Sequence, residues 1–213
     1  MERIWGVDRL EAYLEEVRNP PPGLGFRKRI SLWLQRQKLL TLRKSESLPP
    51  ESSDIYHLVV IAVAKEDQEI VEPAIVSLER QNFSPKRILV VIALEERAEE
   101  NIKQGIRNIE VKYRNSFLDF LVSVHPSHVP GEARVKGANV THAAKEAAQY
   151  FEGKKIPFEH IIVSCFDADT VVSPEYFACL TYHFLVCPER NRASFQPIPV
   201  YHNNIWEAPA FSR

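Results

Sequence analysis

Three uninterrupted apolar runs constrain what this chain can fold into. They cover residues 57–64 (HLVVIAVA), 87–94 (RILVVIAL) and 160–166 (HIIVSCF), and they are rich in β-branched residues. Such runs are typical of strands that are covered on both faces, as in a parallel sheet. Helix-like segments at 68–81, 95–106, 134–151 and 174–186 alternate with them. The alternation predicts an α/β fold of three layers with a mostly parallel sheet between helices. Two further strand candidates lie at 109–114 (IEVKYR) and 117–124 (FLDFLVSV).

The first fifty residues have a different pattern. We expect residues 1–53 to form a helical N-terminal extension and linker, followed by a main domain at 54–213. Within the extension, residues 26–44 hold seven Lys or Arg and no acidic residue. Apolar residues among them can share one face, which predicts a basic amphipathic helix. This helix either attaches to an anionic membrane surface or packs on the main domain with its charges in solvent.

Composition narrows the classes of partner. With 27 basic and 28 acidic residues, the formal net charge is −1, which does not favour nucleic acid as a partner. No apolar run approaches the roughly 20 residues that a membrane helix needs, and the charged N-terminus is not a signal peptide. The three cysteines are too few for a disulfide framework, and we expect buried thiols. These features predict a soluble cytoplasmic chain, with peripheral attachment to a membrane as the remaining alternative.

Charged residues follow each of the three buried runs. They are Lys65, Glu66 and Asp67 after the first, Glu95 and Glu96 after the second, and Asp167 and Asp169 after the third. In open parallel sheets, ligands bind beyond the carboxyl ends of the strands. Mg²⁺ and Mn²⁺ prefer carboxylate oxygens. The Asp-x-Asp directly after a buried strand therefore predicts a divalent metal site.

Other nucleotide and phosphate chemistries fit the sequence less well. The chain has seven glycines, and it contains neither a G-x-G-x-x-G fingerprint nor a P-loop. The segment DADTV (167–171) also fits the first motif of haloacid-dehalogenase-type phosphatases. That chemistry needs a later lysine and further acidic ligands, and no lysine or aspartate follows Val172.

Four segments, taken in order, resemble the nucleotide-sugar half of family 2 glycosyltransferases. They are HLVVIAVAKED (57–67), SLERQNFSPKRILVVIAL (77–94), KGANVTHAAK (136–145) and IIVSCFDADTVVSPEYF (161–177). The resemblance implies a GT-A-type, Rossmann-like fold, a nucleoside-diphosphate sugar as donor, and Mn²⁺ or Mg²⁺ on its diphosphate. Residues 192–206 (RASFQPIPVYHNNIW) resemble the stretch after the metal motif in cellulose-synthase-like members.

The resemblance also assigns roles to single residues. Asp167 and Asp169 match the metal motif, with Asp169 as the direct ligand. Glu66 matches the acidic residue near the base and ribose. Lys136 and Asn139 match a segment that lines the donor diphosphate, where a lysine offsets the charge that grows as the sugar leaves. The alternative for Lys136 is a solvated charge at a helix N-terminus.

Three further residues are candidates on the same basis. Ala62, at the end of the first strand, is expected beside the donor. The family has an aspartate at the end of its second strand, where this chain has Ile92 and Ala93, so Glu95 is the candidate substitute. His202 is the candidate third metal ligand.

The chain stops at Arg213, before the family's later acidic motif and its acceptor and membrane segments. Among the acidic residues after the metal motif, Glu207 is the candidate catalytic base. We therefore expect an inverting, metal-dependent glycosyltransferase domain that is incomplete alone and works with a membrane-bound or acceptor-domain partner. The alternative is a non-catalytic nucleotide-binding domain that acts through a partner chain.

Overall fold

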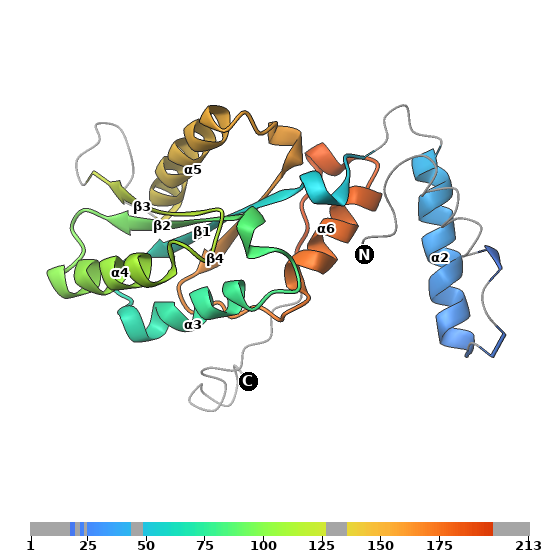
Figure 1. Ribbon diagram of the computed structural model, residues 1–213, viewed down its shortest axis with the longest axis horizontal. Coiled ribbons are helices and arrows are strands. Elements are labelled where there is room, and N and C mark those ends of the chain that lie inside the picture. The colour runs from blue at the N-terminus through green and yellow to red at the C-terminus, as the bar shows by residue number, and fades with distance from the viewer. Residues whose placement is uncertain (1–17, 20–21, 24, 44–48, 127–135, 198–213) are drawn as a thin grey trace.

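The computed structural model describes residues 18–19, 22–23, 25–43, 49–126 and 136–197. Its centre is a four-stranded sheet of β1 (Tyr56–Val63), β2 (Ile88–Glu95), β3 (Asp119–His125) and β4 (Ile161–Asp167). The strand order is β3-β2-β1-β4, and every neighbouring pair is parallel. This confirms the predicted α/β fold with a parallel sheet (Figure 1).

The two central strands are apolar at nearly every position because both of their faces are covered. β1 and β2 are buried along almost their whole length. Val60 of β1 stands opposite Val91 of β2 and Cys165 of β4. Alternate side chains leave a strand on opposite faces, so each strand supplies one set of side chains to each layer of helices.

Helices form a layer on each face of the sheet. On one face α5 (Lys136–Gly153) lies over β1, β2 and β3, and it buries Ala143, Ala147 and Phe151 at a spacing of four residues. On the other face α3 (Gln68–Glu79), α4 (Glu100–Tyr113) and α6 (Tyr176–Val186) share a second core with the sheet. Figure 1 shows α5 above the sheet and α3 and α4 below it.

The predicted strand at 109–114 is wrong, because residues 109–113 form the end of α4 and Arg114 is its C-cap. The buried residues Ile102, Ile106, Ile109 and Tyr113 recur every three or four positions and face the core. That spacing belongs to a helix and cannot place the same residues on one face of a strand.

Helix α4 also carries a glycine at its contact with α3. Gly105 is buried, and a Cβ at this position would lie 3.0 Å from the Cβ of Gln68. The missing side chain therefore allows α4 to approach the beginning of α3.

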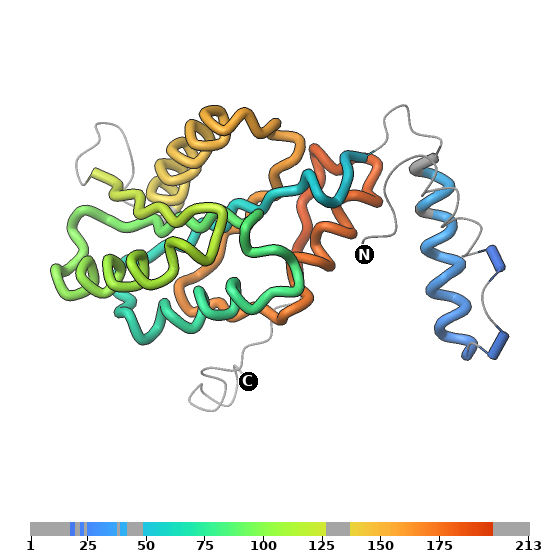
Figure 2. The backbone as a smooth tube through the Cα atoms, viewed as in Figure 1, coloured from blue at the N-terminus to red at the C-terminus, as the bar shows by residue number. Residues whose placement is uncertain are grey.

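The predicted basic helix is α2 (Phe26–Arg43). Leu39 is fully buried in a cluster with Phe184 and Leu185 of α6, so the C-terminal part of α2 packs on the main body. These two segments are in contact although they are far apart in the sequence, and Figure 2 shows α2 beyond α6 at one end of the molecule. Among the described residues, no helix combines the length and the apolar composition needed to cross a bilayer. The division of the chain at residue 53 stays a prediction.

The expectation of three buried thiols is wrong. Cys165 and Cys179 are exposed, and Cys187 is half-buried. Cys165 points to the face of the sheet that α5 covers only over β1, β2 and β3. Its neighbour on that face, Val163, is 56% exposed for the same reason.

Candidate functional site

The strand order places a topological switch point between β1 and β4. From β1 the chain first adds β2 and β3 on one side, and β4 then pairs with the other side of β1. Ligands of open α/β sheets bind at such a point, beyond the carboxyl ends of the strands. In the register of the two strands Ala62 stands opposite Asp167. The residues that follow β1 and the Asp-x-Asp after β4 therefore meet at one edge.

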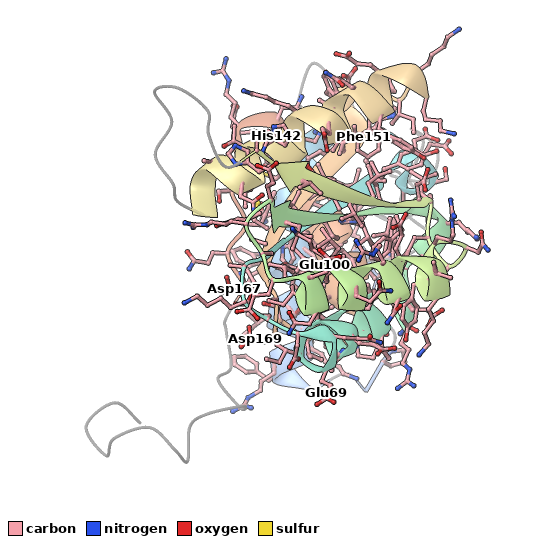
Figure 3. The ribbon with its side chains drawn as sticks, turned by 90° about the vertical axis from the view of Figure 1, so that its left-hand side faces the viewer. Glu69, Glu100, His142, Phe151, Asp167 and Asp169 are labelled. Carbon is pink, nitrogen blue, oxygen red and sulfur yellow. The ribbon has the colours of Figure 1, made fainter. Side chains whose placement is uncertain are left out.

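The two aspartates leave β4 through a tight turn. Asp167 is the last residue of the strand, and its carbonyl oxygen accepts a hydrogen bond of 3.0 Å from the backbone N–H of Thr170. Ala168 between them is buried, whereas Asp167 and Asp169 are both exposed. Figure 3 looks at the carboxyl edge of the sheet and shows both aspartates there.

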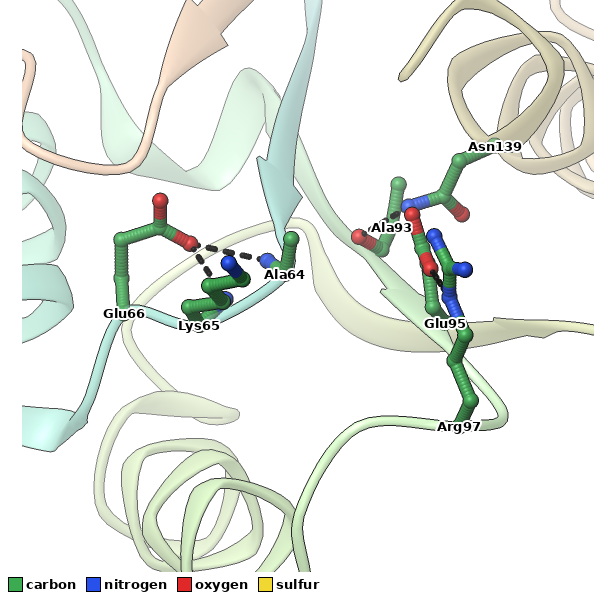
Figure 4. A network of polar contacts seen from close by, with 7 residues as sticks. All are labelled: Ala64, Lys65, Glu66, Ala93, Glu95, Arg97 and Asn139. Carbon is green, nitrogen blue, oxygen red and sulfur yellow. Dashed lines mark hydrogen bonds and ion pairs between the residues drawn. The ribbon is translucent and has the colours of Figure 1, made fainter. Parts of the chain in front are cut away.

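Glu66 is held over the end of β1 by the backbone. Its Oε2 accepts hydrogen bonds from the N–H groups of Ala64, at 2.8 Å, and Lys65, at 3.0 Å (Figure 4). Two N–H donors fix the position of this half-buried carboxylate. Lys65 is itself exposed, so a cation lies directly beside Glu66 at the switch point.

Asp67, the third charged residue after β1, has a structural role. Its Oδ1 accepts hydrogen bonds from the N–H groups of Glu69, at 3.1 Å, and Ile70, at 3.2 Å. This is the N-cap of α3, which satisfies two backbone donors that lack partners within the helix.

Asn139 ties the first turn of α5 to the end of β2. Its Nδ2 donates a hydrogen bond of 2.8 Å to the carbonyl oxygen of Ala93 (Figure 4). The side chain is buried, and its Oδ1 has no hydrogen-bond partner within the described residues. This bond brings the N-terminus of α5 to the carboxyl edge of the sheet. Lys136 is the first residue of that helix, and its side chain lies outside the described part.

Sequence reasoning missed a buried hydroxyl on the strand next to Ala93. Ser123 of β3 stands opposite Ala93 in the register, and it is almost fully buried. Within the described residues its Oγ has no hydrogen-bond partner. The signal was a serine in the apolar run FLVSV, two residues before the end of the strand.

A pair of histidines at the same edge was also missed. The ring of His125, the last residue of β3, lies edge-on to that of His142 on α5, with 5.0 Å between the centroids. The only signal in the sequence was position: His125 directly follows the predicted strand at 117–124, and His142 lies in the first half of the predicted helix at 134–151.

The end of β2 is where this chain has Ile92 and Ala93 in place of the aspartate of the family pattern. Ile92 and Ala93 are fully buried, so no carboxylate occupies their position. Glu95 pairs with Arg97, two residues later (Figure 4). This contact raises the pKa of Arg97 above its usual value. Glu95 is thus near the edge but already has a cationic partner.

The residues present suit a divalent ion that shares its shell with a ligand. Within the described ranges no three His, Cys, Asp or Glu side chains are arranged to hold a metal. Asp167 and Asp169 offer carboxylate oxygens, and Mg²⁺ is usually bound through one or two carboxylates together with substrate phosphates. His202 and Glu207, the candidate third ligand and base, lie outside the described residues.

No protein-family model matches the chain, and no curated protein is significantly similar to it. Among solved structures it is similar to TarS 1–349 of S. aureus, with 19% identity and a TM-score of 0.44 over 62% of this chain and 32% of that one. It is also similar to the mannosyltransferase PcManGT of Pyrobaculum calidifontis, solved with GDP-Man and Mn²⁺, with 13% identity and a TM-score of 0.40. That match covers 81% of this chain and 44% of the other, so this chain spans less than half the length of either protein.

Proposed function

We propose that this chain binds a nucleoside-diphosphate sugar with Mn²⁺ or Mg²⁺ and acts as the donor half of an inverting, family 2-like glycosyltransferase. The observation that carries the proposal is the pairing of β1 with β4 at the switch point. It brings a backbone-held glutamate, Glu66, and an exposed Asp-x-Asp, Asp167 and Asp169, to one edge of the sheet. The sequence resemblance assigns roles to the same residues.

Each of these residues has a role that suits its surroundings. Asp167 and Asp169 would hold the metal, which when bound supplies positive charge to the diphosphate and stabilises the leaving group. Glu66 would accept hydrogen bonds from the ribose or base, since its two backbone donors already orient the carboxylate. The first turn of α5, tied to β2 by Asn139, would turn N–H groups toward the phosphates. Lys136 would add a positive charge there.

The proposed reaction is a single displacement at the anomeric carbon. An oxygen of the acceptor hydroxyl forms a bond to that carbon as the bond from the carbon to the diphosphate oxygen breaks, and the configuration inverts. The hydroxyl proton passes to a base within hydrogen-bond reach. Glu207 remains our candidate for that base.

Calorimetry tests the donor site. UDP and GDP are titrated into the chain with and without Mn²⁺, using the wild type and Asp169→Asn. We expect one nucleotide to bind in a metal-dependent way and the variant to lose most of that binding. Glu69→Gln is the matched control, because it removes one exposed carboxylate from the first turn of α3 and should bind like the wild type. Equal affinity with and without metal would overturn the proposal.

The non-catalytic alternative rests on the end of β2. Ile92 and Ala93 replace the family's aspartate there, and Glu95 is paired with Arg97. If the chain only binds the nucleotide, incubation with nucleotide sugars should release no nucleoside diphosphate. Slow release that Asp169→Asn abolishes would instead favour the enzyme.

A further inference from the structure

Helix α2 carries an apolar stripe that is exposed on the described part of the protein. Phe26, Ile30, Trp33 and Leu34 are 77%, 43%, 57% and 50% exposed. They follow each other at helical spacing, so they share one face of the helix. The other large exposed apolar residues of the described part are scattered singly over α3, α4, β3, β4 and the loops. Single exposed residues are ordinary, whereas a contiguous stripe marks an interaction surface.

The stripe is separate from the face by which α2 packs on the body. At about 100° per residue, fully buried Leu39 lies roughly opposite the centre of the stripe. The contact with α6 therefore holds the helix while leaving the stripe outward. Figure 1 shows α2 at the far end of the domain from α3 and α4, beyond α6.

Basic residues flank the stripe on both sides. By the same angular spacing Arg27 lies beyond Leu34 on one side, and Arg29 lies beyond Trp33 on the other. Both arginines are exposed, and α2 contains no acidic residue. An apolar face between two basic margins is the pattern of a helix that lies in the plane of an anionic membrane surface.

We infer that the outer face of α2 docks the protein on an anionic lipid surface. The aromatic and aliphatic side chains enter the boundary between headgroups and acyl chains, and the flanking arginines contact lipid phosphates. A protein partner would need acidic margins around an apolar groove, but a bilayer of anionic lipid supplies both features along the whole helix of about 27 Å. The Asp-x-Asp edge lies at the opposite end of the sheet from α2 (Figures 1 and 3), so docking leaves it open to solvent. The inference does not depend on the proposed donor site.

Vesicle co-sedimentation of the full chain tests this inference. We expect binding to vesicles of phosphatidylglycerol and phosphatidylcholine at low salt, and at least about tenfold weaker binding to phosphatidylcholine alone. Salt at about 0.5 M should weaken the contact strongly, since it shortens the screening length. The double variant Phe26→Ser/Trp33→Ser should lose about tenfold or more in partitioning. Val111→Ser on α4, whose side chain is 71% exposed, is the matched control and should bind like the wild type.

Tryptophan fluorescence shows whether the stripe itself enters the lipid. The chain has three tryptophans, so Trp5→Phe/Trp206→Phe leaves Trp33 as the single reporter. We expect its emission to shift to the blue with anionic vesicles and to be quenched by brominated acyl chains. Binding that is unchanged in Phe26→Ser/Trp33→Ser, or absent from anionic vesicles, would overturn the inference. So would a dimer in sedimentation equilibrium that this variant abolishes, because a second copy would then cover the stripe.

Discussion

The buried histidine of β1 should make the fold sensitive to acid. His57 is fully buried, its Nε2 lies 2.8 Å from Oγ1 of Thr181, and its ring contacts Phe83 and Phe177 with centroids 4.7 Å apart. Burial, with a smaller effect from the positive charge of Arg87, lowers the pKa of His57 from 6.5 to about 3. The native chain therefore keeps this ring neutral in the pH range around 6.5, where a free histidine side chain takes up its proton.

The pKa shift sets the size of the effect. In the unfolded chain His57 takes up a proton near its ordinary pKa of 6.5. Because only the unfolded chain takes up this proton between pH 6.5 and 3, the contribution of His57 to the free energy of unfolding is fully present above pH 6.5 and is lost as the pH falls toward 3. At about 1.4 kcal/mol per pKa unit, lowering the pH from about 7.5 to about 5 should reduce the free energy of unfolding by about 2 kcal/mol through this residue alone.

Urea unfolding followed by circular dichroism at the two pH values measures this loss. His57→Gln keeps a polar atom near Thr181 and removes the titration. The double variant His57→Leu/Thr181→Val removes both hydrogen-bonding partners together, which avoids leaving either one unsatisfied. Each variant has its own stability at neutral pH, so the quantity compared is the change with pH. The wild type should lose about 2 kcal/mol more than either variant. Equal changes in all three proteins would refute the reasoning.

Three further changes test the packing around the sheet. The pKa of Glu72 is lowered to about 2, chiefly by the hydrogen bond that it accepts from exposed Lys112. Glu72→Gln should therefore reduce the free energy of unfolding in urea by less than about 1 kcal/mol at neutral pH. This difference should fade as the pH drops from 4.5 toward 2. Asn139→Ala removes the side-chain amide that donates to the carbonyl of Ala93 and should cost about 0.5–1.5 kcal/mol by the same assay. Gly105→Ala places a methyl group 3.0 Å from the Cβ of Gln68 on α3. This crowding should outweigh the gain in helix propensity and lower Tm by about 2–4 °C in a calorimetric scan. An unchanged or higher Tm would show that α4 can move away from α3.

The two central strands, β1 and β2, were predictable because they are buried on both faces, whereas β4 was predicted as fully buried but has one exposed face. The run at 57–64 needs no tertiary information to be identified, and β1 begins and ends one residue earlier. The segment 109–114 misled for the opposite reason. Its alternation of apolar and polar residues imitates a strand, and only the earlier isoleucines of α4, at helical spacing, show that the pattern continues through it.

The candidate site was predictable in its parts but not in its assembly. Each charged residue follows a strand, and parallel strands end at one edge, so Glu66 and Asp167 were expected there. That β4 pairs with β1, and does not add beyond β3, follows from long-range packing that no local pattern encodes. The contacts between individual side chains could not be predicted for the same reason. Nothing in the sequence says that Asp67 caps α3 or that Glu95 is paired with Arg97.

The position of β4 in the chain has a consequence for how the molecule is made. β1 meets β2 after a short stretch of synthesis, because His57 pairs with Ile88, but Tyr56 must wait for Ile161. At ribosomal rates of roughly 5–20 residues per second, the time between the synthesis of Tyr56 and that of Ile161 is about 5–20 seconds. During it, one edge of β1 offers unpaired backbone groups to any other strand, which is a known route to aggregation. Among the four described strands, the one that leads into the two aspartates is synthesised last, so nucleotide binding would report completion of this sheet as well as function.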